Sequence, residues 1–374
     1  MKIKRISVRL IACPLERTVV ASSFTKTRRC TVLVTIETDS GIRGRIYAGD
    51  KRDHQEQIAT YIIDDIAPLL IDEELFSVER LWERAVAGSS TASDRDLYMH
   101  ALGAVDSAIW DAIGKALDVP LYQLWGGYQD TLPMIAIGGY YEDDKDLDGL
   151  VAEATEYREL GLDGIKLKVG GASIEEDIAR LAAIRKELGD EYCIACDANR
   201  AWSVIQAITF AERAIEYDLA WLEEPVAWFD QYRGMREVRQ RTNIPVTAGQ
   251  NETAPSGCVR LLNESSVDIL NYDASLGGGP TAWHKVAATA GIQGITMGHH
   301  EEPHLAMHLL ASIPNSGHLE GFHPDLDPIW YQMVENRPPV EDGRLRLPEG
   351  PGFGLTFCEE FIQKYTVDTA AYGR

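Results

Sequence analysis

Short apolar runs alternate with longer amphipathic stretches through the middle of the chain. The runs that read as strands lie near residues 133, 164, 193, 220, 245, 268, 294 and 317. Strands that are separated by helices pair in parallel, and eight of them close into a TIM-type (β/α) barrel. The pattern therefore predicts an α/β fold built around an eight-stranded barrel.

The first part of the chain follows a different pattern, which predicts a small α+β domain. Apolar runs over residues 3–12 and 31–37 predict two strands, and a DSG sequence after them predicts a hairpin turn. Apolar residues at helical spacing predict three helices, over residues 54–69, 77–86 and 97–117.

These patterns divide the chain into three regions. We expect an N-terminal α+β capping domain over residues 1–125, the barrel over residues 126–325 and a C-terminal segment over residues 326–374. In the last region, prolines and glycines interrupt both periodicities, which predicts extended chain and turns. We expect this segment to pack back on the capping domain and complete it.

Polar residues stand at the ends of seven of the predicted barrel strands. The carboxyl ends of barrel strands converge on one mouth, so side chains at these positions are candidates for a single active site. The candidates are Lys166, Lys168, Asp197, Glu223, Gln250, Asp273, His300 and Glu320.

The two lysines occupy alternate positions on one predicted strand. Side chains alternate across a strand, so Lys166 and Lys168 share a face, and the apolar residues between them face the helices. Two neighbouring ammonium groups lower each other's pKa, because a like charge disfavours the charged form. We therefore expect a lysine that acts as a base near neutral pH.

Three oxygen-bearing side chains follow one another on adjacent predicted strands. Asp197, Glu223 and the residue after the fifth strand, Gln250, offer ligands that suit a hard cation such as Mg²⁺. Asn199, two residues beyond Asp197, would point to the same side and contact metal or substrate. Glu224 would face the other side from Glu223 and support the ligands.

Asp273 and His300 end neighbouring predicted strands. A carboxylate beside a histidine holds the imidazole in one tautomer, as an acid or base requires. His299 would then alternate away from the barrel interior. Glu320, on the eighth strand, would support charge that develops on a substrate carboxylate.

Composition excludes several classes of protein. A net charge of −22 argues against a nucleic-acid partner, because such proteins need basic surfaces to displace counterions. No run of about 18 apolar residues is present, so we expect no membrane span. Six scattered cysteines favour buried thiols in a reducing compartment, and hence a cytoplasmic location.

The order of these residues resembles the mandelate racemase subgroup of the enolase superfamily. The stretch over residues 101–127 and the sequences DANRAW and WLEEP are similar to that family as well. The resemblance implies a modified barrel in a homo-oligomer. It also implies that Lys168, with Lys166 beside it, is the base on one face of the substrate, and that His300 with Asp273 serves the other face. Asp197 and Glu223 would bind Mg²⁺.

One position departs from the family pattern. The fifth strand of the family normally ends in Gly-Glu, whereas this chain has Gly249 and Gln250. An amide oxygen can still bind a cation, but one negative charge is lost and metal affinity should fall. Glu252 is the alternative ligand, and our hypothesis is that Gln250 is the third one.

The chemistry that the resemblance implies is abstraction of a proton next to the carboxylate of a small molecule. We expect dehydration of an acid sugar, an aldonate or aldarate, to a 2-keto-3-deoxy acid. A racemase, epimerase or cycloisomerase acting on a 2-hydroxy acid is the alternative. A binding relative without catalysis is a third possibility, because the metal site lacks a carboxylate.

Polar segments of the capping domain are candidates for substrate recognition. They cover residues 22–30 and 48–54 and offer several cations to a polyhydroxy or diacid substrate, although any one of these can instead be ordinary surface charge. The candidate substrate contacts are Tyr47, Lys51 and Arg52, with Lys26, Arg28 and Arg29 as further cations.

Overall fold

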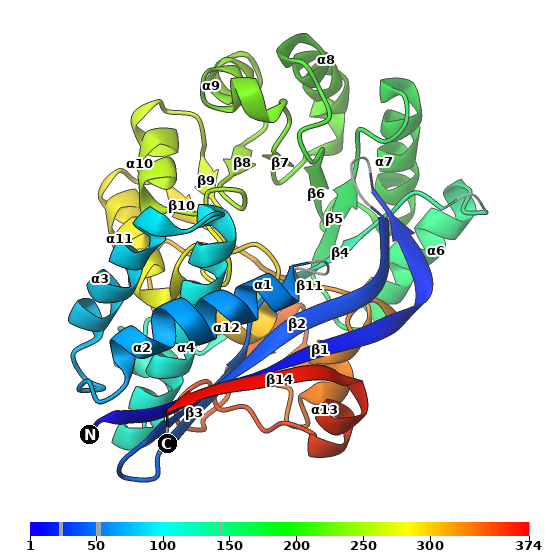
Figure 1. The fold of residues 1–374 in the computed structure, drawn as a ribbon. Helices are drawn as coiled ribbons and strands as arrows, with labels where there is room; N and C mark the ends of the chain where they lie inside the picture. The colour runs from blue at the N-terminus through cyan, green and yellow to red at the C-terminus, as the bar shows by residue number, and fades with distance from the viewer. Residues whose placement is uncertain (22–24, 50–53, 143, 374) are drawn as a thin grey trace.

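The computed structural model describes residues 1–21, 25–49, 54–142 and 144–373. Within these residues the long strands form two sheets, one antiparallel and one mainly parallel. Figure 1 shows the parallel strands at the centre of a ring of helices, with the long strands β1 and β2 crossing below them. The α/β fold with a capping domain is confirmed.

Eight parallel strands of the described chain form the barrel, as predicted. Neighbours pair in chain order from β4 to β10, and β11 pairs with β4. A bridge between Met297 and Ser316 joins β10 to the start of β11 and closes the ring. The strands are β4 (Thr131–Gly138), β5 (Gly164–Lys168), β6 (Cys193–Asp197), β7 (Leu222–Glu223), β8 (Val246–Ala248), β9 (Ile269–Leu270), β10 (Thr296–Met297) and β11 (Leu319–Gly321).

Helices between these strands cover the outside of the barrel (Figure 1). Two of them begin with a capping box, in which Ser173 and Glu176 or Ser203 and Gln206 bond reciprocally to backbone N–H groups. The helices are α6 (Leu147–Glu159), α7 (Ile174–Leu188), α8 (Val204–Ala214), α9 (Gln231–Arg241), α10 (Pro255–Asn263), α11 (Gly279–Ile292) and α12 (Pro303–Ala311).

The capping domain is built on an antiparallel sheet in the order β14, β1, β2, β3. The predicted strands and helices are present, and the first helix contains a π-helical turn at Tyr61–Ile66. The strands are β1 (Ile3–Val20), β2 (Thr25–Thr38), β3 (Arg43–Tyr47) and β14 (Thr366–Gly373). The helices are α1 (Gln55–Thr60), α2 (Ala67–Leu70), α3 (Val78–Gly88), α4 (Arg95–Leu117) and the short α5 (Leu121–Leu124).

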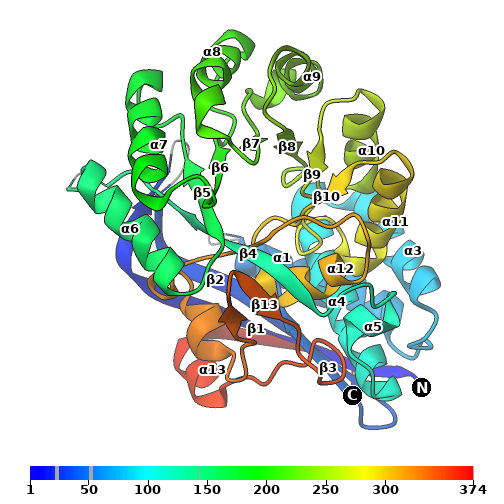
Figure 2. The same cartoon turned by 180° about the vertical axis from the view of Figure 1, so that it is seen from behind.

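The C-terminal segment completes the capping domain, because β14 pairs with β1 along its length. Beyond its proline- and glycine-rich stretches the segment contains α13 (Glu359–Tyr365) and the strand β14, which no sequence pattern predicted. A hairpin of β12 (Val340–Glu341) and β13 (Arg344–Arg346) also adds to β4 in antiparallel fashion. Figure 2 shows β13 beside β4 from behind.

Helix α4 connects the capping sheet to the barrel. Its alanine-rich stripe packs against the sheet so closely that a Cβ at Gly44 of β3 would lie 2.0 Å from the carbonyl oxygen of Ala108. A Cβ at Gly103 would lie 2.8 Å from the carbonyl oxygens of Ala274 and Ser275. These residues follow Asp273, so α4 supports the loop that carries one of the candidate catalytic residues.

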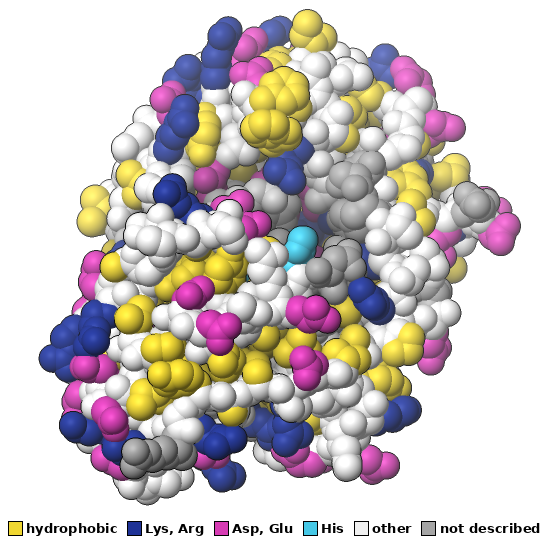
Figure 3. Space-filling view, viewed as in Figure 1, with side chains coloured by type: hydrophobic (Ala, Val, Ile, Leu, Met, Phe, Trp, Pro, Cys, Tyr) yellow, Lys and Arg dark blue, Asp and Glu magenta, His cyan; other side chains and the backbone are white. Residues whose placement is uncertain are grey.

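Figure 3 shows a surface on which acidic and basic side chains are interspersed. The surface is hollowed between the capping elements and the upper helices of the barrel, and a histidine side chain is visible there. No helix in the described part of the chain is long and apolar enough to cross a membrane.

Candidate active site

The two lysines of β5 are buried and point into the barrel, as the alternation predicted. Nζ of Lys168 lies 2.6 Å from Oδ2 of Asp197 on the adjacent strand. Nζ of Lys166 lies 2.6 Å from Oε1 of Glu320 and 3.1 Å from Oε1 of Glu223. The structure thus brings together five candidates from four strands, β5, β6, β7 and β11.

The expected lowering of the lysine pKa values was wrong for this arrangement. Burial by itself lowers the pKa of Lys168, but attraction to Asp197 and Tyr140 and the hydrogen bond to Asp197 together outweigh burial and the repulsion from Lys166, so the pKa is raised. Burial likewise opposes the charged form of Lys166, and attraction to Glu223 and Glu320 raises its pKa well above the usual value. Carboxylates, not the second ammonium group, dominate the surroundings of each lysine.

Asp197 and Glu223 stand side by side in the register of β6 and β7. Burial favours a protonated Asp197, but attraction to Lys168 and Lys166 lowers its pKa. Asn199 donates its backbone N–H to Oδ1 of Asp197 at 2.8 Å and its side-chain amide to Oδ2 at 3.1 Å. The left-handed backbone of Asn199, with φ of 46°, folds this amide back toward the carboxylate.

Of the buried amide oxygens that lack a hydrogen-bond partner within the described residues, two lie in the loops directly after β6 and β8. They are Oδ1 of Asn199 and Oε1 of Gln250. Buried polar atoms are normally paired, so unpaired oxygens beside carboxylates are suited to bind a cation or a polar group of a substrate. A group of three or more His, Cys, Asp or Glu residues that could hold a metal ion is absent from the described part of the chain. Any hard cation here therefore depends on an amide oxygen as well as on Asp197 and Glu223.

Glu224 and Glu252 lie on different sides of Gln250. Oε2 of Glu224 accepts hydrogen bonds from Nε2 of Gln250 at 3.1 Å and from Nδ2 of Asn251 at 2.6 Å. This leaves Oε1 of Gln250 as the unpaired atom, and Glu224 orients the amide. The carboxylate of Glu252, the alternative ligand, instead accepts a hydrogen bond from the hydroxyl of Tyr232 in α9 at 3.1 Å.

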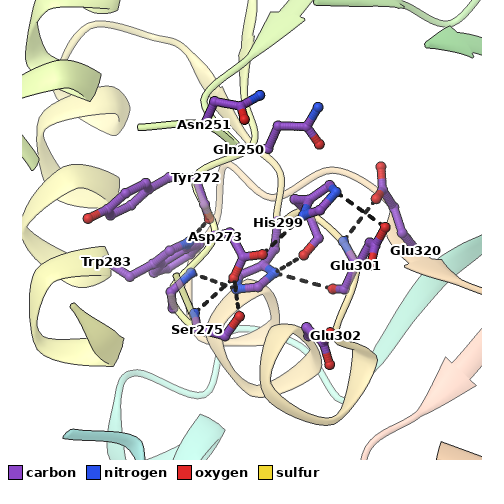
Figure 4. A network of polar contacts seen from close by, with 12 residues as sticks. Gln250, Asn251, Tyr272, Asp273, Ser275, Trp283, His299, Glu301, Glu302 and Glu320 are labelled. Carbon is purple, nitrogen blue, oxygen red and sulfur yellow. Dashed lines mark hydrogen bonds and ion pairs between the residues drawn. The ribbon is translucent and has the colours of Figure 1, made fainter. Parts of the chain in front are cut away.

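His300 has a carboxylate beside each ring nitrogen. Figure 4 shows the polar network to which both carboxylates, those of Asp273 and Glu301, belong. Nδ1 lies 3.0 Å from Oδ2 of Asp273, as the pairing predicted, and Nε2 lies 3.4 Å from Oε1 of Glu301. Burial alone lowers the pKa of His300, but Glu301 and Asp273 together raise it to about 10. The ring is therefore an imidazolium at neutral pH.

His299 is fully enclosed beside this pair. Its Nε2 accepts a hydrogen bond from the backbone N–H of Ala274 at 3.0 Å, and its Nδ1 lies 3.0 Å from the carbonyl oxygen of His300. Ser275 bonds to Oδ1 of Asp273 through both its N–H and its hydroxyl. His299 and Ser275 therefore fix the loop that carries Asp273, whereas the His300 side chain keeps 19% of its surface exposed.

Sequence reasoning missed Glu301 as a neighbour of His300. Glu301 and Glu302 both adopt left-handed backbone conformations, with φ of 47° and 48°. Their carboxylates lie 3.3 and 3.0 Å from the guanidinium of Arg29, and Asp327 lies 3.4 Å from it. No sequence signal marks two consecutive left-handed glutamates, so only the structure reveals this placement.

The structure describes only some of the predicted substrate contacts of the capping domain. Arg29 is 3% exposed inside the acidic cluster just described, so the structure corrects its assignment as a surface cation for substrate. Tyr47 is buried and stacks on His304 with ring centroids 3.5 Å apart, rather than facing an open pocket. Lys51 and Arg52 lie outside the described residues.

Comparison with known proteins places this arrangement in a family. Residues 5–126 match the mandelate racemase/muconate lactonizing enzyme N-terminal domain, and residues 149–361 match the enolase C-terminal domain-like family. The chain belongs to the mandelate racemase/muconate lactonizing enzyme family of the enolase superfamily.

Solved structures of the family superpose over nearly the whole chain. A mandelate racemase/muconate lactonizing enzyme from a marine actinobacterium, in complex with magnesium, is 42% identical, with a TM-score of 0.92 over 98% of this chain and 99% of that one. L-talarate dehydratase from Polaromonas sp. JS666, complexed with Mg and L-glucarate, is 28% identical, with a TM-score of 0.91 over 100% and 99% of the two chains.

Curated relatives of the chain have several activities. Arabinonate dehydratase from Saccharolobus solfataricus is 28% identical over 80% of this chain and 81% of its own length. Others at similar identity are named as dehydratases, cycloisomerases and an epimerase. The relatives are thus enzymes whose reactions differ, and identity at this level does not select one of these reactions for the chain.

Proposed function

We propose that this protein is a Mg²⁺-dependent dehydratase that converts an acid sugar, an aldonate or aldarate, into a 2-keto-3-deoxy acid. The observation that carries the proposal is the position of His300 between Asp273 and Glu301. Two flanking carboxylates stabilise the imidazolium, and an imidazolium is suited to protonate a hydroxyl group as it leaves.

The base in this proposal is Lys168. In the ring of strands β5 is separated from β10 by β4 and β11, so Lys168 and His300 approach the mouth from well-separated directions. Lys168 would remove the proton next to the substrate carboxylate, and the electron pair of the broken C–H bond would form a C=C bond. His300 would donate its proton to the β-hydroxyl, which departs as water, and the resulting enol would tautomerise to the 2-keto acid.

The donor set fits a magnesium ion. Asp197 and Glu223 provide carboxylates, and Gln250 provides the unpaired Oε1. When bound, the cation would stabilise negative charge that develops on the substrate carboxylate. A cation bound to Asp197 would also weaken the ion pair between Asp197 and Lys168, which now keeps the lysine protonated. The neutral amine of Lys168, the form that acts as a base, would then be favoured.

The remaining candidates have supporting roles in this proposal. Lys166 would neutralise Glu223 and Glu320 and hold both carboxylates in place, as its contacts of 3.1 and 2.6 Å suggest. The unpaired Oδ1 of Asn199 is available to a substrate hydroxyl or to the cation. The relatives named as dehydratases, and the one solved with Mg and L-glucarate, support an acid sugar as substrate class.

A racemase or epimerase is the second candidate. Lys168 and His300 are separate proton-transfer groups, and a curated relative is named as an epimerase. A cycloisomerase would use the same first step, and two relatives carry that name. An imidazolium at His300 would also return a proton to the face opposite Lys168 in these reactions, so the product distinguishes them from dehydration.

The direct test is to incubate the protein with Mg²⁺ and a panel of aldonates and aldarates, and to follow 2-keto acid formation with semicarbazide. We expect a keto acid from at least one substrate, with loss of activity in EDTA and in the Lys168→Ala variant. Arg43→Ala, an exposed substitution in β3 of the capping domain, is the matched control. Racemisation without any keto acid would contradict the proposal, and no reaction with any acid sugar would favour a binding protein.

A further inference from the structure

A cavity of about 240 Å³ lies inside the barrel, beneath the side chains of the active site. It is formed by the strands β7 to β11, where inward positions carry small residues such as Gly298 and Gly317. Trp221 forms one wall, and Glu320, the partner of Lys166, stands at the inner end. None of the roles proposed above uses this space.

The cavity opens at the end of the barrel opposite the mouth. Ala220, Ile269 and His318 stand at or before the beginnings of their strands, and they are partly exposed. Asn271 and Glu320 lie further along their strands and are 2% and 3% exposed. The space therefore runs from the N-terminal ends of the strands up to the carboxylate of Glu320.

Unpaired polar atoms line the inner half of this cavity. Oγ1 of Thr247 and both amide atoms of Asn271 are buried without a hydrogen-bond partner in the described chain. A polar atom that stays buried and unpaired destabilises the folded state. A buried water needs two to four polar partners and roughly 30 Å³, so the space suits several waters bonded to Thr247, Asn271 and Glu320.

We propose that this cavity is a water-filled passage that joins Glu320 to solvent at the N-terminal end of the barrel. It is a second solvent connection to the site, separate from the mouth that faces the capping domain. Glu320 accepts from Lys166 and from the backbone N–H of Glu301 at 3.0 Å, and its remaining lone pairs are available to water. The passage does not depend on the proposed reaction.

Crystals of the protein, with and without xenon pressure, test the passage directly. We expect ordered waters within hydrogen-bond distance of Thr247 Oγ1, the Asn271 amide and a Glu320 oxygen, and no xenon among them. Dry apolar cavities bind xenon, whereas hydrated polar ones do not. Xenon beside Trp221 or Ile269 in a cavity without water would overturn the proposal.

A stability measurement gives an independent answer without any assay of activity. Replacing Thr247 by Val exchanges the hydroxyl for a methyl group of similar size. Relative to the wild type, the denaturant midpoint of the variant should fall if that hydroxyl is bonded to water, and should rise if it is unpaired. Thr31→Val calibrates the fall, because the buried hydroxyl of Thr31 donates to the carbonyl of Ala48. A higher denaturant midpoint for Thr247→Val, together with a lower one for Thr31→Val, would contradict the proposal that the cavity is hydrated.

A blocking variant tests whether the passage is continuous. A Cβ at Gly317 would meet only Thr296 and Met297, at 3.4 and 3.5 Å, so a side chain there fits without backbone strain. We expect crystals of Gly317→Val to lose the waters near the N-terminal opening, while Gly317→Ala keeps them. An unchanged chain of waters in Gly317→Val would show that solvent enters by another route.

Discussion

At the scale of single residues, the contact between His300 and Glu301 decides how the histidine can act. Glu301 is fixed by Arg29 and by its own backbone N–H on Glu320, so its carboxylate stays 3.4 Å from Nε2 of His300. With Asp273 on Nδ1, the ring keeps its proton until the pH approaches about 10. The group is therefore poised as an acid throughout the physiological range.

The variant Glu301→Gln should shift the alkaline limb of the pH profile. With its pKa raised to about 10, His300 stays in the acid form through neutral pH and loses it as pH rises through about 10. Removing one carboxylate lowers that pKa, so kcat should decline at a lower pH, by about one unit or more. Glu302→Gln is the matched control, because Glu302 contacts Arg29 and His304. Identical profiles for both variants would contradict the role of Glu301.

Metal affinity should respond to Gln250 and be insensitive to Glu252. Gln250→Glu adds a carboxylate, and calorimetry with Mn²⁺ should show binding tighter by on the order of tenfold, because ligand charge sets affinity. The metal-free variant should lose about 1 kcal/mol of stability, since the new carboxylate faces Glu224. Glu252→Gln should leave the affinity unchanged. If Glu252→Gln weakened Mn²⁺ binding and Gln250→Ala did not, Glu252 would be the third ligand instead of Gln250.

The positions of the site residues were more predictable than their charge states. Alternation along β5 correctly placed Lys166 and Lys168 inside, because period 2 is a local property of any strand. Their pKa values depend on carboxylates from other strands, whose distances no local pattern contains. For the same reason the contact of Glu301 with His300 needed the structure.

At the scale of elements, buried polar contacts fix the junctions around the site. Helix α4 carries Asp106, whose carboxylate accepts from the N–H and the hydroxyl of Thr281 in the first turn of α11, at 2.9 and 2.8 Å. Burial raises the pKa of Asp106 to about 7. The contact therefore attaches α11 to the capping domain, and its strength depends on pH.

Asp106→Asn should stabilise the protein at alkaline pH. The raised pKa means that the protonated carboxyl favours the folded state below the unfolded pKa, and that this contribution is lost as pH rises through about 7. A neutral amide accepts from the Thr281 N–H through its oxygen and donates its NH₂ to the Thr281 hydroxyl at every pH. The free energy of unfolding in urea should be higher for Asp106→Asn than for the wild type, and this difference should grow by about 2 kcal/mol between roughly pH 5 and pH 8. A difference that does not vary with pH would contradict this account.

Strand β2 is attached to the barrel through Arg29. Removing this guanidinium takes one cation away from the buried carboxylates of Glu301, Glu302 and Asp327. Arg29→Met should therefore cost about 3–5 kcal/mol of unfolding free energy. Arg28→Met, at the adjacent exposed position, should change stability by less than about 0.5 kcal/mol. Equal effects of the two substitutions would show that the acidic cluster does not stabilise the junction.

Elements with strong periodicity were predicted well, and the C-terminal ones were not. The eight barrel strands are short, but each precedes an amphipathic helix, and this repetition indicates them. Most residues of β14 are exposed, so the strand carries no apolar pattern. It exists because it pairs with the edge of β1, which is a tertiary effect.

At the scale of the whole molecule, the barrel collects side chains from seven strands at one mouth and the capping domain lies across it (Figure 1). Order along the chain predicted this convergence, because parallel strands place their carboxyl ends together. The molecule also has an internal cavity that opens at the opposite end of the barrel. Nothing in the sequence indicated it, because its lining residues come from five different strands and their ends.

The most direct measurement of the central claim is proton NMR of an acid-sugar substrate with Mg²⁺ in D₂O. The account predicts that the wild type forms a 2-keto-3-deoxy acid and that Lys168→Ala neither forms it nor exchanges the α-proton. His300→Asn should lose elimination but still exchange the α-proton for deuterium, because Lys168 remains. Loss of exchange in His300→Asn with retention in Lys168→Ala would contradict the assignment of base and acid.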